Sequence, residues 1–130
     1  MKLNQLREAT WKVTSLLPFL VPKRKSSRER VQGVLAQFYE AFPELRKQTK
    51  VHKKGLIFTQ MYVELFGSPE RLRQATYHFY DLLIKLYAGN HVATSMYTSR
   101  RDKIIDKLNQ QEATQTSLIA KLASNGVEIR

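Results

Sequence analysis

The residues best able to do chemistry in this chain are cations, and they are grouped. Ten of the twenty-two Lys and Arg residues lie between positions 20 and 54, a stretch with only three acids. A first group contains Lys23, Arg24, Lys25, Arg28 and Arg30, and a second contains Arg46, Lys47, Lys50, Lys53 and Lys54. Since like charges repel and oppose compaction, this excess points to an external polyanion, of which nucleic acid is the commonest.

A third group of cations stands later in the chain, at Arg100, Arg101 and Lys103. We expect a helix to begin close to it, where cations oppose the helix dipole unless an anion is near. The first group flanks Ser26 and Ser27, either of which could cap a helix whose free amides also favour phosphate. The thirteen cations therefore predict contact with a phosphate backbone, and the alternative is a set of solvated linkers kept soluble by charge.

Catalytic and metal-binding chemistry is not expected. The chain has no Cys, and its three His residues are scattered. Asp102 and Asp106 stand one helical turn apart, but Lys103 and Lys107 beside them favour solvated ion pairs over a metal site. No phosphate-binding glycine loop or dinucleotide motif is present. We therefore expect no enzyme, no metal and no cofactor.

All the elements that position these cations are expected to be helices, because no stretch alternates apolar with polar residues. The predicted helices cover residues 2–17, 26–42, 55–66, 68–88 and about 95–123, and the second cationic group forms a connector. The helix at 55–66 is apolar nearly all round and should be central. A polar stretch at 109–117 predicts that the last helix either extends past its domain or meets a polar partner. The fold class is thus all-α, a single basic helical domain over 1–130 built as a bundle of four or five helices.

Aromatic residues mostly follow apolar helical stripes and are expected in the core. Three tyrosines, Tyr77, Tyr80 and Tyr87, follow a second stripe of the helix at 68–88 and are interpreted as interface residues. A helix-turn-helix at 55–88 is an alternative, but its second helix is long and apolar on two faces, as a bundle core requires.

Size, charge and helical character together resemble the small helical subunits of CRISPR effector complexes. They also resemble the basic accessory proteins of diversity-generating retroelements. No single motif carries either resemblance, so no residue role is transferred. Both imply a non-catalytic protein that holds nucleic acid within a larger assembly.

The sequence therefore predicts a cytoplasmic subunit that contacts the backbone of nucleic acid, RNA favoured over DNA, within a ribonucleoprotein or an oligomer. The partners expected besides nucleic acid are other protein subunits or further copies of the chain. The alternative is a protein–protein adaptor whose basic face binds an acidic partner. Binding to a membrane is not expected, because the cations lie in connectors and helix starts and do not line one amphipathic face.

Overall fold

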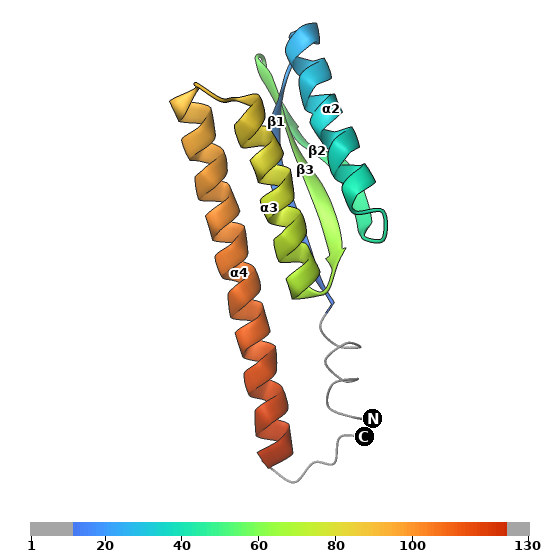
Figure 1. The fold of residues 1–130 in the computed structure, drawn as a ribbon, viewed down its shortest axis with the longest axis vertical. Helices are drawn as coiled ribbons and strands as arrows, with labels where there is room; N and C mark the ends of the chain where they lie inside the picture. Colours follow the sequence, from blue (N-terminus) through green and yellow to red (C-terminus); the bar gives the residue numbers. More distant parts are fainter. Residues whose placement is uncertain (1–11, 125–130) are drawn as a thin grey trace.

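The computed structural model describes residues 12–124, in which a three-stranded antiparallel sheet carries helices on one face (Figure 1). The elements are β1 (Val13–Pro22), α2 (Lys25–Ala41), β2 (Arg46–Lys54), β3 (Phe58–Gly67), α3 (Pro69–Leu86) and α4 (His91–Ser124). The strand order is β1-β3-β2, so β1 and β2 run parallel on either side of β3. The expected all-α bundle of four or five helices is wrong, since the described chain combines a sheet with three helices.

Strand β1 replaces part of the helix expected at 2–17, whose first residues lie outside the described chain. Leu17, Phe19 and Val21 alternate along it and are buried beneath the helices. The intervening positions carry Leu16, Pro18, Leu20 and Pro22 on the opposite face, which hides the alternation from a simple polarity pattern. Pro18 and Pro22 suit this strand because no described strand lies along its outer edge, and proline lacks the N–H that a neighbour would need.

Strands β2 and β3 form a hairpin where the sequence predicted a basic connector and a central helix. Val63 and Leu65 of β3 are buried under the helices, whereas Phe58 and Phe66 are partly exposed on the other face. Strand β2 has almost no apolar residues because it is an edge strand, and lysines on an edge strand oppose pairing with another chain.

The helices expected at 26–42, 68–88 and about 95–123 are confirmed, with corrected starts for the first and the last. Helix α2 begins one or two residues early, and its cap residue Arg24 makes no side-chain capping bond, so the predicted serine cap is wrong. Helix α3 begins as predicted, with the Ser68 hydroxyl accepting the N–H of Arg71 at 3.3 Å. Helix α4 begins at His91 because the side chain of Asn90 accepts the N–H of Ala93 at 3.1 Å.

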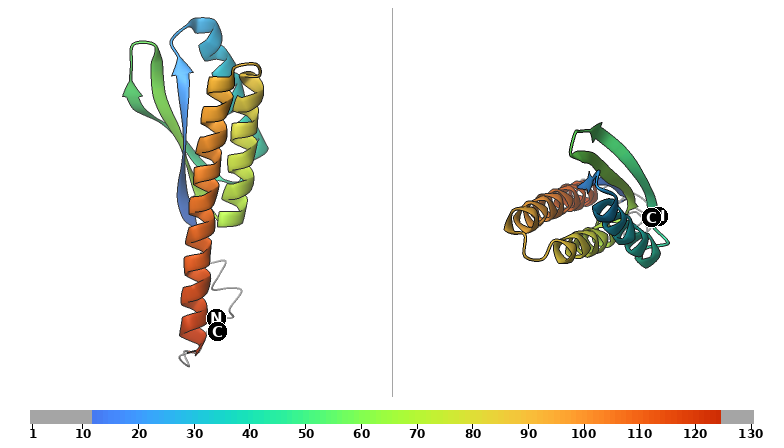
Figure 2. Two further views of the ribbon diagram at one scale, coloured as in Figure 1. Left: turned by 90° about the vertical axis from the view of Figure 1, so that its left-hand side faces the viewer. Right: turned by 90° about the horizontal axis from the view of Figure 1, so that it is seen from above.

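One core joins the sheet to α2 and α3. The ring of Phe79 lies 5.0 Å from that of Phe38 on α2 and 5.5 Å from that of Phe19 on β1, so one side chain of α3 connects three elements. Helix α4 packs on α3 and against β1, and the views in Figure 2 show its last turns running past the sheet. The polar stretch at 109–117 belongs to this region, where Glu112 pairs with Arg73 of α3 at 2.8 Å.

Candidate functional site

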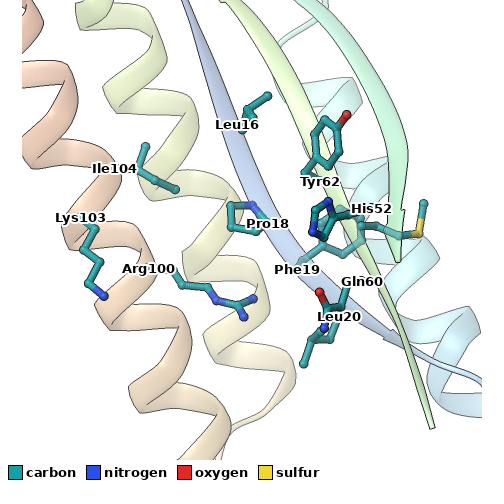
Figure 3. Close-up of a pocket in the computed structure, with 11 residues that line it drawn as sticks. Leu16, Pro18, Phe19, Leu20, His52, Gln60, Tyr62, Arg100, Lys103 and Ile104 are labelled. Atoms are coloured by element: carbon teal, nitrogen blue, oxygen red, sulfur yellow. The ribbon is translucent and has the colours of Figure 1, made fainter. Parts of the chain in front are cut away.

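The uncovered face of the sheet meets α4 in a groove of about 480 Å³ (Figure 3). Strand alternation explains its floor. Leu16, Pro18 and Leu20 of β1 stand opposite Glu64, Tyr62 and Gln60 of β3, so all of these side chains lie on the face that the helices do not cover. Arg100, Lys103 and Ile104 of α4 form one wall, and His52 of β2 lies opposite.

The groove combines an apolar floor with a cationic rim. Leu16, Pro18 and Ile104 supply apolar surface, and Tyr62 adds an aromatic ring. Arg100 and Lys103 extend from α4 on the side facing the strands in Figure 3. No acidic residue is among the described residues that line the groove. Such a site favours an anionic ligand that also carries flat or apolar groups.

Two tyrosine hydroxyls hold β1 against the helices behind this groove. The Tyr97 hydroxyl of α4 accepts the backbone N–H of Leu20 at 3.1 Å, and the Tyr80 hydroxyl of α3 donates to the carbonyl of Pro18 at 2.8 Å. Burial raises the pKa of Tyr97 to about 12 and raises the pKa of Tyr80 further. Both hydroxyls therefore stay protonated at neutral pH. Tyr97 joins β1 to α4, and Tyr80 joins β1 to α3.

The second cationic group is divided by the pleat of β2. Arg46, Lys50 and Lys53 pair in register with Phe66, Tyr62 and Gln60 and so belong to the uncovered face. Lys47 and Lys54 pair with Leu65 and Thr59 on the opposite side. The Nζ of Lys47 contacts the carbonyls of Phe42 and Leu45 and lies 5.2 Å from the ring of Tyr39. Desolvation at this place lowers the pKa of Lys47. Its contacts join the start of β2 to the end of α2.

The first cationic group lies at one end of the molecule. Lys23, Arg24, Lys25 and Arg28 surround the start of α2, and all four are exposed. The N–H of Lys23 donates to the carbonyl of Ile57 at 3.1 Å, so this start lies beside the turn between β2 and β3. Arg30 is exposed further along α2. The first group and the last residues of the second, Lys53 and Lys54, thus lie at the same end of the molecule.

The third cationic group is divided by the turn of α4. Arg100 and Lys103 reach the groove, and the Arg100 guanidinium lies 5.9 Å from the ring of Tyr97. Arg101 instead faces α3, where it pairs with Asp81 at 3.6 Å, and it also pairs with its neighbour on α4, Asp102, at 3.1 Å. The prediction that all thirteen cations act together is therefore not matched by their placement, since Arg101 and Lys47 are engaged within the protein.

The three tyrosines interpreted as an interface do not share a surface. Tyr80 is fully buried, so its assignment to an interface is wrong for the described chain. The ring of Tyr87 stacks on that of Tyr97 at 5.9 Å. Tyr77 is 43% exposed and lies under the Arg101 guanidinium at 5.5 Å.

Sequence reasoning missed the groove's residues from the strands. The sequence assigns Gln60 and Tyr62 to a predicted helix and His52 to a predicted connector. The signal that could have placed the β3 residues on one face is their spacing at every second position: Phe58, Gln60, Tyr62, Glu64 and Phe66. Among residues 12–124, no group of three His, Asp or Glu side chains is arranged to hold a metal ion. No helix in that range is long and apolar enough to cross a membrane.

No known family model, curated protein or solved structure matches this chain. The all-helical character on which the two resemblances partly rested does not hold, because the described fold contains a sheet. The function is therefore argued from the site alone.

Proposed function

We propose that this protein binds nucleic acid as a non-catalytic subunit, with a single strand lying on the uncovered sheet face and in the groove beside α4. The observation that carries this proposal is the gathering of cations and partly exposed aromatic rings on one face. Arg46, Lys50 and Lys53 of β2 and Arg100 and Lys103 of α4 border that face. Phe58, Tyr62 and Phe66 of β3 stand on it at every fourth position.

The two kinds of side chain have different tasks. Cations neutralise phosphates and release counterions, which gives affinity without reading the sequence. Aromatic rings stack on unpaired bases, which a single strand exposes and a duplex does not. Gln60 and His52 in the groove add polar atoms that could contact a ribose hydroxyl, which supports RNA over DNA.

One acid stands on this face among the described strand residues. Glu64 pairs with Lys50 at 3.3 Å, and both side chains are more than one-third exposed. An ion pair exposed to this extent contributes little to stability, so a phosphate can displace Glu64 from Lys50. Replacing Glu64 should therefore strengthen binding, because Lys50 becomes free and a repulsive charge is removed.

The test is fluorescence anisotropy with labelled RNA and DNA strands of about 16 nucleotides, single and double, over a range of salt. Arg100→Gln should weaken single-strand binding and reduce the salt slope by about 0.7 for each phosphate that the variant no longer neutralises. Arg101→Gln is the matched control, since this neighbour is ion-paired on the far side of α4 and should leave affinity unchanged. Glu64→Gln should raise affinity. Equal weakening by Arg100→Gln and Arg101→Gln would contradict the groove.

An acidic protein partner is the second candidate, and the free edge of β2 favours it. No described strand pairs with the outer side of β2, and an extended acidic segment could add there as a fourth strand. Such a partner would depend on the β2 backbone and its lysines and not on Arg100. Binding of an acidic peptide that survives Arg100→Gln, together with failure to bind any RNA or DNA strand, would favour the adaptor.

A further inference from the structure

Two of the three most exposed large apolar side chains of the described chain stand at the turn between β2 and β3. Leu56 is 95% exposed and Ile57 is 70% exposed, and Phe58 follows at 41%. Hairpin turns ordinarily use Gly, Asn or Asp, because these residues accept turn conformations and interact with water. Two large aliphatic residues in this place have no role in the turn itself and indicate an external contact.

The turn is held firmly by its neighbours. The N–H of Gly55 donates to the carbonyl of Phe58 at 2.9 Å, and strand pairing continues up to Lys54 and Thr59. A Cβ at Gly55 would lie 2.7 Å from the carbonyl oxygen of Phe58, so only glycine allows this close approach. The exposed pair therefore belongs to an ordered hairpin tip.

A collar of cations surrounds this tip. Lys53 and Lys54 precede it on β2, and Lys23 is bonded through its N–H to the carbonyl of Ile57. Arg24 and Lys25 continue the collar at the start of α2, which lies at the same end of the molecule as the hairpin turn in Figures 1 and 2. No acid occurs at positions 20–28 or 45–63, so the collar has no negative charge from these segments.

We propose that this tip docks on an anionic lipid surface, with Leu56 and Ile57 entering the boundary between headgroups and acyl chains. The collar would then lie at the depth of the lipid phosphates, each cation adding attraction to anionic headgroups. A single nucleic-acid strand fits the collar but not the tip, because aliphatic side chains have no ring that stacks on an unpaired base. The sequence predicts no membrane binding, because its cations lie in connectors and helix starts. The fold brings two of these segments, the start of α2 and the end of β2, together beside an apolar tip.

The test is co-sedimentation of the full chain with vesicles of phosphatidylcholine, alone or mixed with phosphatidylglycerol. The wild type should bind the mixed vesicles, and binding should weaken with salt. Leu56→Ser with Ile57→Ser should reduce binding by at least about tenfold, and Lys53→Gln with Lys54→Gln by about fivefold for each lysine. Leu118→Ser on α4, where Leu118 is 56% exposed, is the control and should bind as the wild type does.

Each outcome bears on the proposal. Equal binding to both vesicle types, or none, overturns it, as does full binding by the double serine variant. Capture of duplex DNA through Leu56 and Ile57 without vesicle binding also overturns it, since the tip would then be a wedge between base pairs. Arg100→Gln should keep vesicle binding and the double serine variant should keep strand binding, so this proposal and the groove can fail separately.

Discussion

The hydroxyl of Tyr97 should matter more to stability than its size suggests. Tyr97→Phe removes one oxygen and keeps the ring, but it leaves the N–H of Leu20 without its partner 3.1 Å away in a partly buried place. An unpaired buried donor costs about 1–3 kcal/mol. Because this site is only partly buried, we expect the free energy of unfolding to fall by about 1–2 kcal/mol, the lower part of that range.

Tyr80→Phe is the companion change. It removes the donor to the carbonyl of Pro18, whose bond is 2.8 Å long. A carbonyl that loses one partner is tolerated somewhat better than an unpaired N–H, so the cost should be about 1 kcal/mol. Tyr77→Phe is the control, because Tyr77 is 43% exposed and removal of its hydroxyl should change stability by less than about 0.5 kcal/mol.

The assay is urea denaturation followed by circular dichroism, in which a lower midpoint at constant slope reports reduced stability. Hydrogen exchange at the Leu20 amide gives a local readout, and this amide should exchange faster in Tyr97→Phe than in Tyr77→Phe. If Tyr97→Phe unfolds at the wild-type midpoint, or if Tyr77→Phe is destabilised equally, the two hydroxyls do not hold β1 in place.

Three further predictions concern pH, a turn and a cap. The pKa of Tyr97 is about 12 in the folded chain against about 10 when unfolded, so its contribution is complete below pH 10 and should be lost as pH rises to 12. Across that range the stability measured by urea denaturation should fall by about 2 kcal/mol more in the wild type than in Tyr97→Phe. Gly55→Ala should cost about 1–3 kcal/mol in the same assay, because its Cβ would meet the Phe58 carbonyl oxygen at 2.7 Å. Ser68→Ala should cost about 1 kcal/mol and lower the thermal midpoint by a few degrees, since Arg71 would lose its capping acceptor.

The sequence predicts α2 and α3 well because each of these helices buries one face. Val31, Val34 and Phe38 repeat at helical spacing on α2, and Ser68 with Pro69 marks the start of α3. A period of this kind is visible without any knowledge of partners. These two helices are therefore the part of the fold that local reasoning can recover.

The sheet could not be recovered in the same way, for a different reason in each strand. β1 and β3 carry apolar residues on both faces, such as Leu16 beside Leu17 and Tyr62 beside Val63, so their alternation is concealed. β2 conceals it by being almost wholly polar, as an edge strand can be. The β-bulge between Val51 and Lys53 shifts the period once more.

The candidate site shows the same limit. Judged by charge alone, Arg100 and Arg101 are equally good candidates for the site. Adjacent residues of a helix, however, point about 100° apart. Only the packing of α4 against β1 and α3 decides that Arg100 reaches the groove and Arg101 pairs with Asp81. Tyr62 was not recognised as a site residue, because its place in the groove depends on strand β3, which the sequence pattern did not predict.

The strand order also has a consequence for how the chain is made. Among residues 12–124, β1 pairs only with β3. Pro22 therefore cannot pair until Phe58 has been made, and Val13 cannot pair until Gly67, 54 residues later, has been made. At ordinary rates of translation the ribosome needs about 3–10 s to add those residues. During that time a nascent segment that is apolar on two faces has no partner, whereas β2 and β3 can pair as soon as both have emerged. A chaperone that recognises extended apolar segments should therefore engage residues 13–22 during synthesis and release them when the hairpin arrives.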